Sequence, residues 1–312
     1  MNMPSDLKTL ATALGQDEAS LLQPTLGHGE GSIVNERLIG ALLDAKAALG
    51  AERLQEILDF ARDKGLRFGE AAIALGLVSQ DQVLHALSEQ FGYAYTSEER
   101  RQLMPELVGL NQPFSMQAEA FREIRSQLIA KLFSNESGPR PALAVVSPSP
   151  GDGKTFFSAN IAVSLAQVGN RTLLIDADLR GPRLHDVFKL ENKTGLSSLL
   201  SGRVSADVIQ TIPDVANLFV MPVGITPPNP LELIDRQGFS MLMRELTTKF
   251  AHVIIDTPAM MFGVDAQVIA ARAGAALVVA RKDQSRMASL QRLVAVLSQS
   301  PVRLAGVIMN EF

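Results

Sequence analysis

The residues best suited to binding or catalysis lie where an apolar run meets a glycine-rich turn. Residues 147–155 have the sequence Ser-Pro-Ser-Pro-Gly-Asp-Gly-Lys-Thr, and a helical pattern then continues to about Gln167. A strand, a glycine-rich turn and a helix beginning with Lys-Thr can bind a polyphosphate, because backbone N–H groups and the positive helix end face the phosphates. Lys154 would neutralise phosphate oxygens, and the Thr155 hydroxyl would be a ligand for Mg²⁺. The residues expected at the nucleotide are Pro150, Gly151, Asp152, Gly153, Lys154, Thr155 and Phe156.

A simpler interpretation of this segment exists. Pro148 stands where the usual phosphate-binding loop has its first glycine. A tight turn between a strand and a helix, with an exposed lysine, would produce the same pattern. Other motifs in the sequence must therefore decide between a phosphate-binding loop and a simple turn.

Three aspartates at strand ends favour the phosphate-binding loop. Asp176 and Asp178 end the run Leu-Leu-Ile-Asp-Ala-Asp-Leu-Arg, and Asp256 ends Val-Ile-Ile-Asp-Thr-Pro. Parallel sheets bind ligands at the carboxyl ends of their strands, and residues two apart on an extended segment point to one side. Asp176 and Asp178 are therefore expected to face the phosphates together, one near Mg²⁺ and one accepting a proton from an incoming hydroxyl. Any one aspartate could cap a helix instead, but the combination predicts a Mg-nucleotide site.

The segments that position these residues alternate between strand-like and helical patterns. A helix is expected from Met116 to about Phe133, and the later short runs are apolar on both faces, as in parallel strands covered by helices on both sides. We therefore predict an α/β domain of the P-loop NTPase class, with a doubly wound and mostly parallel sheet. The expected strands are Ala142–Ser147, Thr172–Asp176, Leu218–Pro222, His252–Asp256, Ala275–Ala280 and Leu304–Met309.

The N-terminal third has a different organisation. Residues 1–35 lack sustained periodicity, and residues 36–95 have helical spacing that repeats at an offset of 29, so that Gly40 matches Gly69 and Leu54 matches Val83. Each copy predicts a short helix, a break and a longer helix, the second with Ser79 as its N-cap. We expect a weakly ordered segment (1–35), a small all-α module (36–95), a linker (96–115) and the P-loop domain (116–312).

Composition excludes several classes of function. The 312 residues contain no cysteine, which removes disulfides, thiol catalysis and cysteine-ligated metals. A net charge of −4 and a pI of about 5.7 argue against broad nucleic-acid binding. No apolar run approaches the roughly 18–20 residues of a membrane span, and residues 1–15 lack a signal-peptide core. A cytoplasmic protein that meets a membrane only through a partner is the expectation.

The motifs resemble those of the bacterial tyrosine kinases (BY-kinases), over about residues 115–312. The likeness rests on the phosphate-loop sequence, on Asp176-x-Asp178-x-Arg180-x-Pro182 and on Asp256-Thr-Pro, and Pro-Pro-Asn-Pro-Leu-Glu-Leu from Pro227 also fits. With a separate helical module in front, the chain is most similar to EpsG-type chain-length determinant kinases of exopolysaccharide biosynthesis.

The resemblance implies roles for individual residues. ATP and Mg²⁺ are the implied cofactors, with Lys154 and Thr155 at the phosphates and the metal. Asp176 is the implied catalytic base, while Asp178 and Asp256 serve the metal. Two further nucleotide contacts are implied, by Arg180 and, at the adenine, by Asn310.

The resemblance also implies two kinds of partner. Glu119-x-x-Arg122-x-x-Arg125 is similar to the family's self-association motif, and this spacing places all three on one helical stripe. The plainer alternative is an exposed helix with one weak ion pair. Such kinases also work with a transmembrane polysaccharide co-polymerase protein that activates them.

The helical module resembles the N-terminal domain of type II secretion ATPases. Some of that class bind cyclic di-GMP through Arg-Leu-Gly motifs, which are approximated here by Arg67-Phe68-Gly69 and, out of register, by Arg37-Leu38-Ile39-Gly40. A shifted arginine would remove one side of a symmetric clamp. A protein-docking module is therefore preferred over a dinucleotide site.

The acceptor tyrosine is the main departure from the family. The tyrosine-rich tail typical of the family is absent, and the chain's two tyrosines are Tyr93 and Tyr95. Aromatic packing at alternate positions is their plainer interpretation. Three hypotheses remain open: an ATP-dependent tyrosine kinase, a slow ATP-hydrolysing switch that controls assembly, and a scaffold that merely binds nucleotide. The paired aspartates favour the kinase over the scaffold.

Overall fold

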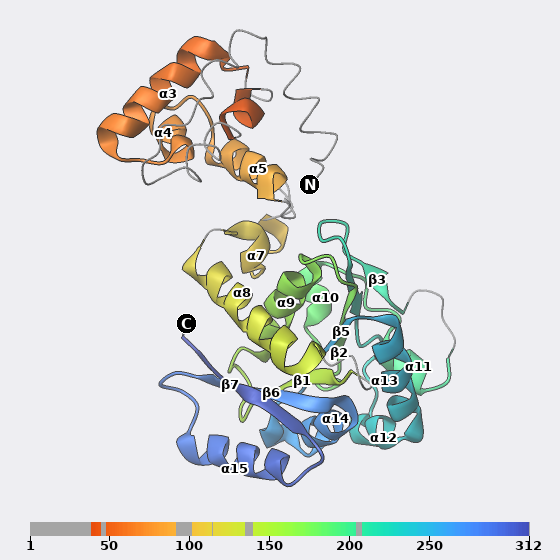
Figure 1. Cartoon of the computed structure of the whole chain (residues 1–312). Coiled ribbons are helices and arrows are strands. Elements are labelled where there is room, and N and C mark those ends of the chain that lie inside the picture. The colour runs from red at the N-terminus through yellow and green to blue at the C-terminus, as the bar shows by residue number, and fades with distance from the viewer. Residues whose placement is uncertain are drawn as a thin grey trace. The chain divides into compact units, whose positions relative to one another are not determined.

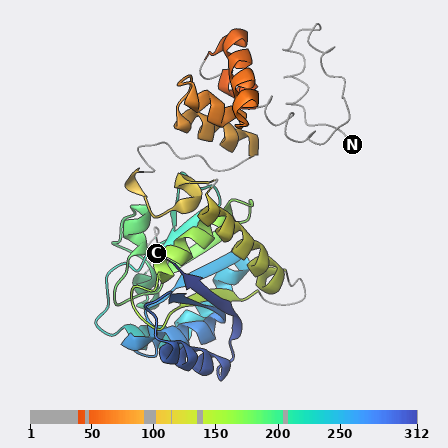
Figure 2. The ribbon, with the colours of Figure 1, turned by 90° about the vertical axis from the view of Figure 1, so that its left-hand side faces the viewer.

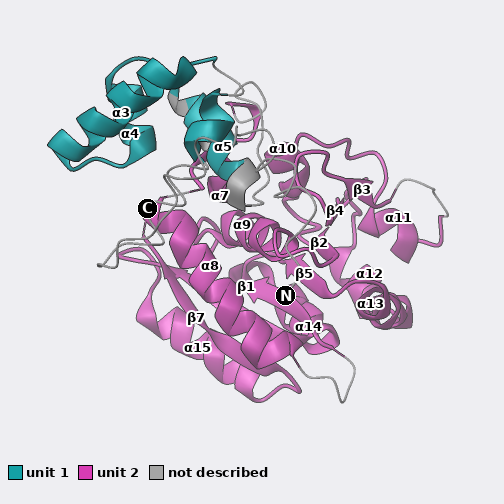
Figure 3. Ribbon diagram, turned by 45° about the horizontal axis from the view of Figure 1, so that its top comes forward, with its two compact units in different colours: residues 1–91 teal, residues 92–312 magenta. Residues whose placement is uncertain are grey.

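The computed structural model describes residues 39–44, 48–91, 102–113, 115–134, 140–203 and 208–311. The chain divides into two compact units, residues 1–91 and 92–312 (Figure 3). The segment expected to be weakly ordered, residues 1–35, lies outside the described residues. Within the described part, no helix has the length and apolar character needed to cross a bilayer.

The first unit is a small helical module with the predicted internal repeat. Helical residues 39–44 are followed by α3 (Gly50–Lys64), α4 (Phe68–Ala74) and α5 (Gln80–Phe91). Gly50 is the first residue of α3, and Gly76 lies shortly before α5; their φ angles of 76° and 68° are a conformation that favours glycine. Ser79 caps the second long helix as predicted, because its hydroxyl accepts the backbone N–H of Gln82. In return, the side-chain oxygen of Gln82 accepts the backbone N–H of Ser79, which completes a capping box.

The core of this module explains its motif glycine. Phe68 is buried, and a Cβ atom on Gly69 would lie 2.6 Å from Cγ1 of Val83. Gly69 is therefore required for the close approach of α4 to α5. The equivalent residues of the two copies, Leu49 and Val78, are both buried.

The second unit is built on a seven-stranded sheet with the order β3-β4-β2-β5-β1-β6-β7 (Figure 1). All neighbouring strands are parallel except β3 and β4, so the predicted doubly wound, mostly parallel sheet is confirmed. The two-residue strand β3 was not predicted, because so short a segment has no detectable periodicity. The strands are β1 (Ala142–Val146), β2 (Thr172–Asp176), β3 (Gln210–Thr211), β4 (Leu218–Met221), β5 (His252–Asp256), β6 (Gly274–Arg281) and β7 (Arg303–Asn310).

Helices cover both faces of this sheet (Figures 1 and 2). Strand residues alternate between the two layers, so that Leu143 and Val145 of β1 pack in one core and Ala144 and Val146 in the other. The first layer contains α7 (Val108–Asn111), α8 (Met116–Leu128), the π-helical turn η2 (Ile129–Phe133), α9 (Lys154–Ala166) and α10 (Leu184–Phe188). The second contains α11 (Leu196–Leu200), α12 (Pro230–Asp235), α13 (Gln237–Lys249), the 3₁₀ turn η3 (Met260–Phe262), α14 (Asp265–Ala273) and α15 (Met287–Ser298).

Part of the predicted linker belongs to this second unit. Leu107 is fully buried, and Met104 and Leu110 are nearly so, all three in the core that also contains α8 and α9. The prediction of a linker up to residue 115 is therefore wrong for residues 104–110. Proline, glycine and asparagine suggested a loop there, but the apolar residues between them pack against the P-loop domain.

The strand register brings the motif residues to one edge of the sheet. Asp176 of β2 pairs directly with Asp256 of β5, and Asp256 also pairs with Val145 of β1. The phosphate loop leaves β1 at Ser147, two residues beyond that pair. Three segments with polar residues therefore meet at the carboxyl ends of neighbouring strands, where α/β sheets bind ligands.

Candidate active site

A cavity of about 720 Å³ lies at these strand ends. It combines the phosphate loop, the turns after β2 and β5, the end of β6 and the segment that precedes α8. Its size is within the range of small-molecule sites. The lining residues are Pro105, Glu106, Val108, Asn111, Gln112, Gln117, Pro150, Gly151, Gly153, Lys154, Thr155, Phe156, Asp178, Gly181, Arg183, Ala259, Phe262 and Arg281.

The phosphate loop has the conformation that anion binding requires. Gly151 and Gly153 have φ of 78° and 96°, values that a side chain would strain. Helix α9 begins at Lys154, so its free N–H groups and positive end point toward the cavity. The ammonium of Lys154 is held by the Ser147 hydroxyl at 3.0 Å. All the predicted loop residues except Asp152 line the cavity.

Asp152 fastens the loop instead of lining the cavity. Its Oδ2 accepts the backbone N–H of Ser149 at 2.8 Å, and its Oδ1 accepts the Ser285 hydroxyl at 2.7 Å. The Asn310 amide donates to the Asp152 carbonyl at 3.2 Å. The structure therefore gives Asp152 and Asn310 a positioning role, in which the turn after β6 and the end of β7 hold the phosphate loop.

Asp256 lies beneath Thr155. Its two carboxylate oxygens accept the hydroxyls of Thr155 at 2.6 Å and Ser158 at 3.2 Å. Burial raises the pKa of Asp256 to about 6, although these hydrogen bonds and the charge of Lys154 oppose the shift. The carboxylate therefore loses its proton at a higher pH than an exposed aspartate does.

Asp176 and Asp178 lie in different surroundings. Asp176 is fully buried; its Oδ1 accepts the backbone N–H of Asp178, while its Oδ2 accepts those of Arg183 and Leu184. Burial raises the pKa of Asp176 well above its usual value, and the charge of Asp256 adds to this shift.

Asp178, in contrast, is half-buried and lines the cavity. The expectation that both carboxylates face the phosphates is therefore wrong. Strand β2 ends at Asp176, so the alternation of an extended chain does not continue to Asp178. Asp178 also holds part of the turn, since its Oδ1 accepts the backbone N–H groups of Arg180 and Gly181, but of the two carboxylates it is the one that lines the cavity.

Arg180 is likewise used within the protein. Its guanidinium binds both carboxylate oxygens of Asp265 at 3.1 Å, and Asp265 is buried at the start of α14. This bidentate pair fixes the turn that carries Asp178. Arg180 is not among the cavity-lining residues, so its predicted nucleotide contact is not what the structure shows.

Sequence reasoning missed the wall that faces the phosphate loop. Arg183 and Phe262 line the cavity there, together with Glu106 and neighbouring residues of the segment before α8. Arg281 was missed as well; it lines the cavity and donates to the carbonyl of Gly151 in the loop itself at 3.5 Å. One sequence signal was available: Asn160 carries an amide side chain in the middle of the largely apolar helix α9, and a buried amide needs hydrogen-bond partners. The partner is the segment before α8.

The residues present fit a bound Mg²⁺. Among the described residues, no group of three metal-binding side chains forms a cage for a metal. Magnesium, however, is commonly held by one or two carboxylates together with substrate phosphates and water. The hard oxygens of Thr155 and Asp256, beside a loop that fits phosphates, satisfy that requirement.

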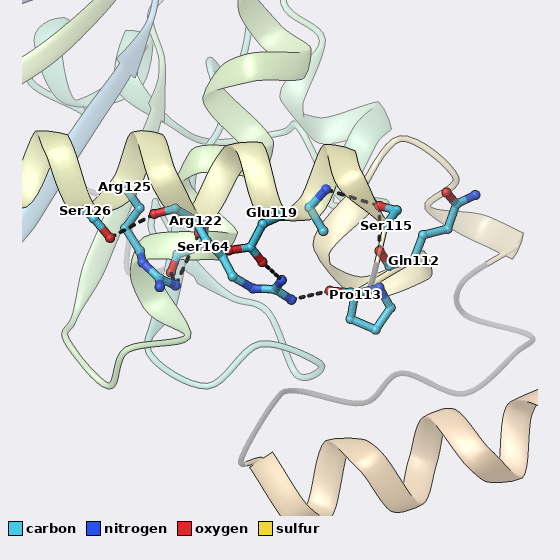
Figure 4. Close-up of polar contacts among 9 residues, drawn as sticks. Gln112, Pro113, Ser115, Glu119, Arg122, Arg125, Ser126 and Ser164 are labelled. Carbon is cyan, nitrogen blue, oxygen red and sulfur yellow. Dashed lines mark hydrogen bonds and ion pairs between the residues drawn. The ribbon is translucent and has the colours of Figure 1, made fainter. Parts of the chain in front are cut away.

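The Glu119-Arg122-Arg125 motif lies on α8, as predicted, but its arginines make contacts within the chain (Figure 4). Arg122 binds Glu119 at 2.6 Å and donates to the carbonyl of Pro113. Arg125 donates to the carbonyl of Ser164 at 3.1 Å. The side chain of Glu119 is 71% exposed and that of Arg122 only 17%, so Glu119 is the member of this pair that faces solvent.

Comparison with known proteins first defines the class. A family model for the CobQ/CobB/MinD/ParA nucleotide binding domain matches residues 143–312. The second unit therefore belongs to this class of nucleotide-binding proteins, in agreement with the phosphate loop and the parallel sheet.

Individual relatives then define the family. The chain is 35% identical over 202 residues to the putative tyrosine-protein kinase CapB of Staphylococcus aureus, which covers 64% of this chain and 87% of CapB. The kinase domain of the Escherichia coli tyrosine kinase ETK is 30% identical, with a TM-score of 0.62, over 72% of this chain and 92% of that domain. The chain belongs to the bacterial tyrosine kinase family, which confirms the predicted resemblance.

Other relatives are much longer than the matched region. The tyrosine-protein kinase Ptk of Acinetobacter johnsonii is 36% identical over 192 residues, which are 62% of this chain and 26% of Ptk. The chain therefore spans about a quarter of the length of that relative. The activity of Ptk as a whole cannot be assigned to this chain from the match alone.

Proposed function

We propose that this protein binds Mg-ATP and transfers the γ-phosphoryl group to a tyrosine hydroxyl. The observation that carries the proposal is the position of Asp178, a half-buried carboxylate that shares one cavity with Lys154 of the phosphate loop. A protein that only binds nucleotide needs the lysine but has no use for this carboxylate. The family relationship supports the same conclusion.

The chain's own residues divide the work. The N–H groups at the start of α9 and the ammonium of Lys154 bind the phosphates. The tyrosine oxygen forms a bond to the γ-phosphorus, the bond from that phosphorus to the β–γ bridging oxygen breaks, and ADP leaves. The hydroxyl proton passes to the carboxylate of Asp178. This assignment places the base at Asp178, whereas the resemblance implied Asp176.

Thr155 and Asp256 would hold the magnesium ion. When bound, Mg²⁺ neutralises charge on the phosphates and orients them. Asp256 must be ionised for this task, and the Lys154 charge together with the hydroxyls of Thr155 and Ser158 favours the ionised form. The Asp256 side chain is thus part of the binding site without lining the open cavity.

The test is phosphate transfer from labelled ATP by the full chain with Mg²⁺. We expect phosphotyrosine on the protein or on an added glutamate–tyrosine copolymer, and none with Lys154→Ala. If transfer is to the chain itself, mass spectrometry must find it at Tyr93 or Tyr95, because the sequence contains no other tyrosine. Both lie outside the described residues.

A nucleotide-dependent assembly switch is the second candidate function. The observation that favours it is the scarcity of tyrosine, two residues in 312. Release of inorganic phosphate without phosphotyrosine, with the copolymer present, would support the switch and overturn the kinase.

The biological setting proposed here is exopolysaccharide biosynthesis. By the family resemblance, the protein would regulate polymer chain length or export, reside in the cytoplasm and reach the inner membrane through a transmembrane co-polymerase protein. A cytoplasmic segment of that partner should raise the rate of tyrosine phosphorylation. No change in rate on its addition would contradict this part of the proposal.

The N-terminal module is proposed to dock a protein. Phe68 and Gly69 of the near-match motif serve the module's core, and Arg37 of the other copy lies outside the described residues. Calorimetry with cyclic di-GMP discriminates: no heat at high micromolar ligand supports a docking module, and saturable heat supports a dinucleotide site.

A further inference from the structure

The wall of the cavity opposite the phosphate loop is fastened to the loop's own helix. Asn160, a buried residue of α9, accepts the backbone N–H of Val108 at 2.7 Å and donates to the carbonyl of Glu106 at 2.9 Å. The same amide donates to the carbonyl of Phe156. Because Asn160 lies on the helix that starts at Lys154, the backbone at Glu106 is held at a fixed place relative to the phosphate loop.

Glu106 in turn holds a second cation of the cavity. Its carboxylate binds the guanidinium of Arg183 at 2.5 Å, and both residues line the cavity. The backbone of Arg183 is anchored, since its N–H donates to buried Asp176. Its side chain is 52% exposed, and that of Glu106 is 33% exposed, so the pair is partly open to solvent.

An exposed ion pair of this kind is easily exchanged. Such pairs contribute about 0–1 kcal/mol, because water screens the charges and ordering long side chains has an entropic cost. Arginine binds phosphate through two parallel hydrogen bonds, and a nucleotide's terminal phosphate has more negative charge than one carboxylate. A phosphate that reaches this wall should therefore displace Glu106 from Arg183.

The position of Arg183 selects which phosphate it meets. Arg183 follows Asp178 by five residues, on the same turn after β2, and both line the cavity. In the proposed reaction the transferred group lies between the phosphate loop and Asp178. A cation on the turn that carries Asp178 therefore lies at the part of the cavity where the γ-phosphate, which ADP lacks, is transferred.

We propose that Arg183 is a second phosphate-binding residue that recognises the γ-phosphate of ATP, and that Glu106 competes with the nucleotide for it. This inference rests on the proposed function, because it assumes that ATP occupies the cavity. It makes Arg183 a residue that discriminates ATP from ADP, and it makes the segment before α8 sensitive to the bound nucleotide.

The test compares the affinities of the full chain for ADP and for the non-hydrolysable analogue AMPPNP, both with Mg²⁺, by calorimetry. Arg183→Ala should weaken AMPPNP binding about tenfold, the effect of losing a charge-assisted hydrogen bond, and change ADP binding by less than about twofold. Arg183→Lys should restore part of the loss. Glu106→Gln should have the opposite effect on AMPPNP affinity and tighten binding about two- to fivefold, since it removes the carboxylate that competes with the phosphate for Arg183.

A purely structural ion pair would behave differently. Arg183→Ala and Glu106→Gln would then shift both nucleotides alike, or weaken both, and either result overturns the inference. Arg272→Ala is the matched control, because Arg272 also forms an exposed ion pair, with Asp235, and neither residue lines the cavity. Melting temperatures of all variants without nucleotide identify any loss of folding.

The outcomes also separate this inference from the proposed function. If the unaltered protein binds neither nucleotide, the proposed function fails. If it binds AMPPNP and Arg183→Ala has no effect on the ratio of the two affinities, only the role of Arg183 is overturned.

Discussion

The two walls of the cavity are constructed in opposite ways. On the phosphate-loop side, Lys154 and Asp256 are buried, and short hydrogen bonds fix their side chains. On the facing side, Glu106 and Arg183 meet in an ion pair that is largely exposed to solvent. One wall is preorganised for binding, whereas the other can rearrange at little energetic cost.

This difference has a functional consequence. A preorganised wall binds the part common to ATP and ADP without discriminating between them. The facing wall contains Asp178 and Arg183, which meet the group that is transferred. Substitutions on the first wall should therefore abolish binding, and substitutions on the second should alter catalysis or selectivity.

The largest effect is expected for Lys154→Ala. The variant removes the buried cation at the phosphates and should reduce Mg-ATP binding and phosphate transfer by at least about 100-fold. Lys249→Ala is the control, because Lys249 forms an exposed ion pair with Glu245 on α13. Retained tyrosine phosphorylation in the Lys154 variant would show that the cavity is not the active site.

The next largest effect separates the two aspartates. Asp178→Asn should lower kcat about 100-fold with little change in ATP affinity, because it removes the proton acceptor while the amide oxygen can still accept the backbone N–H groups of Arg180 and Gly181. Asp176→Asn should instead lower the free energy of unfolding by about 1–3 kcal/mol, since one buried backbone N–H loses its acceptor. A fall in kcat for the Asp176 variant alone, with unchanged stability, would reverse the assignment.

Loss of the Asn160 hydrogen bonds to the segment before α8 should have a smaller effect. Asn160→Ala leaves the N–H of Val108 and the carbonyl of Glu106 without their partner, and should cost about 1–3 kcal/mol of stability by chemical denaturation. It should also raise the AMPPNP-to-ADP affinity ratio, because Glu106 is no longer held where it competes with the nucleotide for Arg183. An unchanged unfolding midpoint would mean that this segment is not held by Asn160 in solution.

A moderate effect of pH follows from Asp256. Its folded-state pKa of about 6 lies above the usual value of 3.8, and the metal requires the ionised form. Mg-ATP affinity should therefore be about tenfold lower at pH 5 than at pH 7. Binding that is independent of pH over this range would contradict the role of Asp256.

Stability should change in the opposite direction over the same range. Because the folded state holds the Asp256 proton more tightly than the unfolded chain, stability without nucleotide declines as pH rises from about 4 to 6. Buried Asp176 should act in the same direction. Asp256→Asn should flatten part of this decline, as measured by denaturant unfolding at each pH.

The smallest energetic effect is expected on α8. Glu119→Arg breaks an exposed pair worth about 0.5 kcal/mol, yet it should lower the molar mass in solution if this helix face mediates self-association. Gln127→Ala on the same helix is the control. An unchanged mass for Glu119→Arg, measured by light scattering, would remove the interface proposal.

Features with strong local patterns could be predicted from the sequence. Five of the six longer strands are apolar runs buried on both faces, β7 is an apolar edge strand that is partly exposed, and the phosphate loop joins a strand to a helix, so these features could be recognised from neighbouring residues. Ser79 was likewise found from its place before a helix. Each of these depends on contacts within a few residues of the chain.

The missed features depend on contacts between distant residues. Nothing near Arg180 in the sequence indicates that Asp265 binds it, and nothing near Leu107 indicates that α9 covers it. Asp176 and Asp178 are separated by a turn whose geometry comes from the backbone hydrogen bonds of Arg183 and Leu184. The phosphate-loop wall was therefore predictable, whereas on the facing wall Asp178 was predicted and Glu106 and Arg183 were not.

Joint action of the two walls in transferring phosphate to tyrosine can be followed in a single turnover. The γ-phosphate of labelled Mg-ATP is traced with the full chain in excess and the tyrosine copolymer present. We expect most of the label to appear as phosphotyrosine, and Asp178→Asn to leave it on ATP. Recovery of the label as inorganic phosphate, with none on tyrosine, would contradict the proposed transfer.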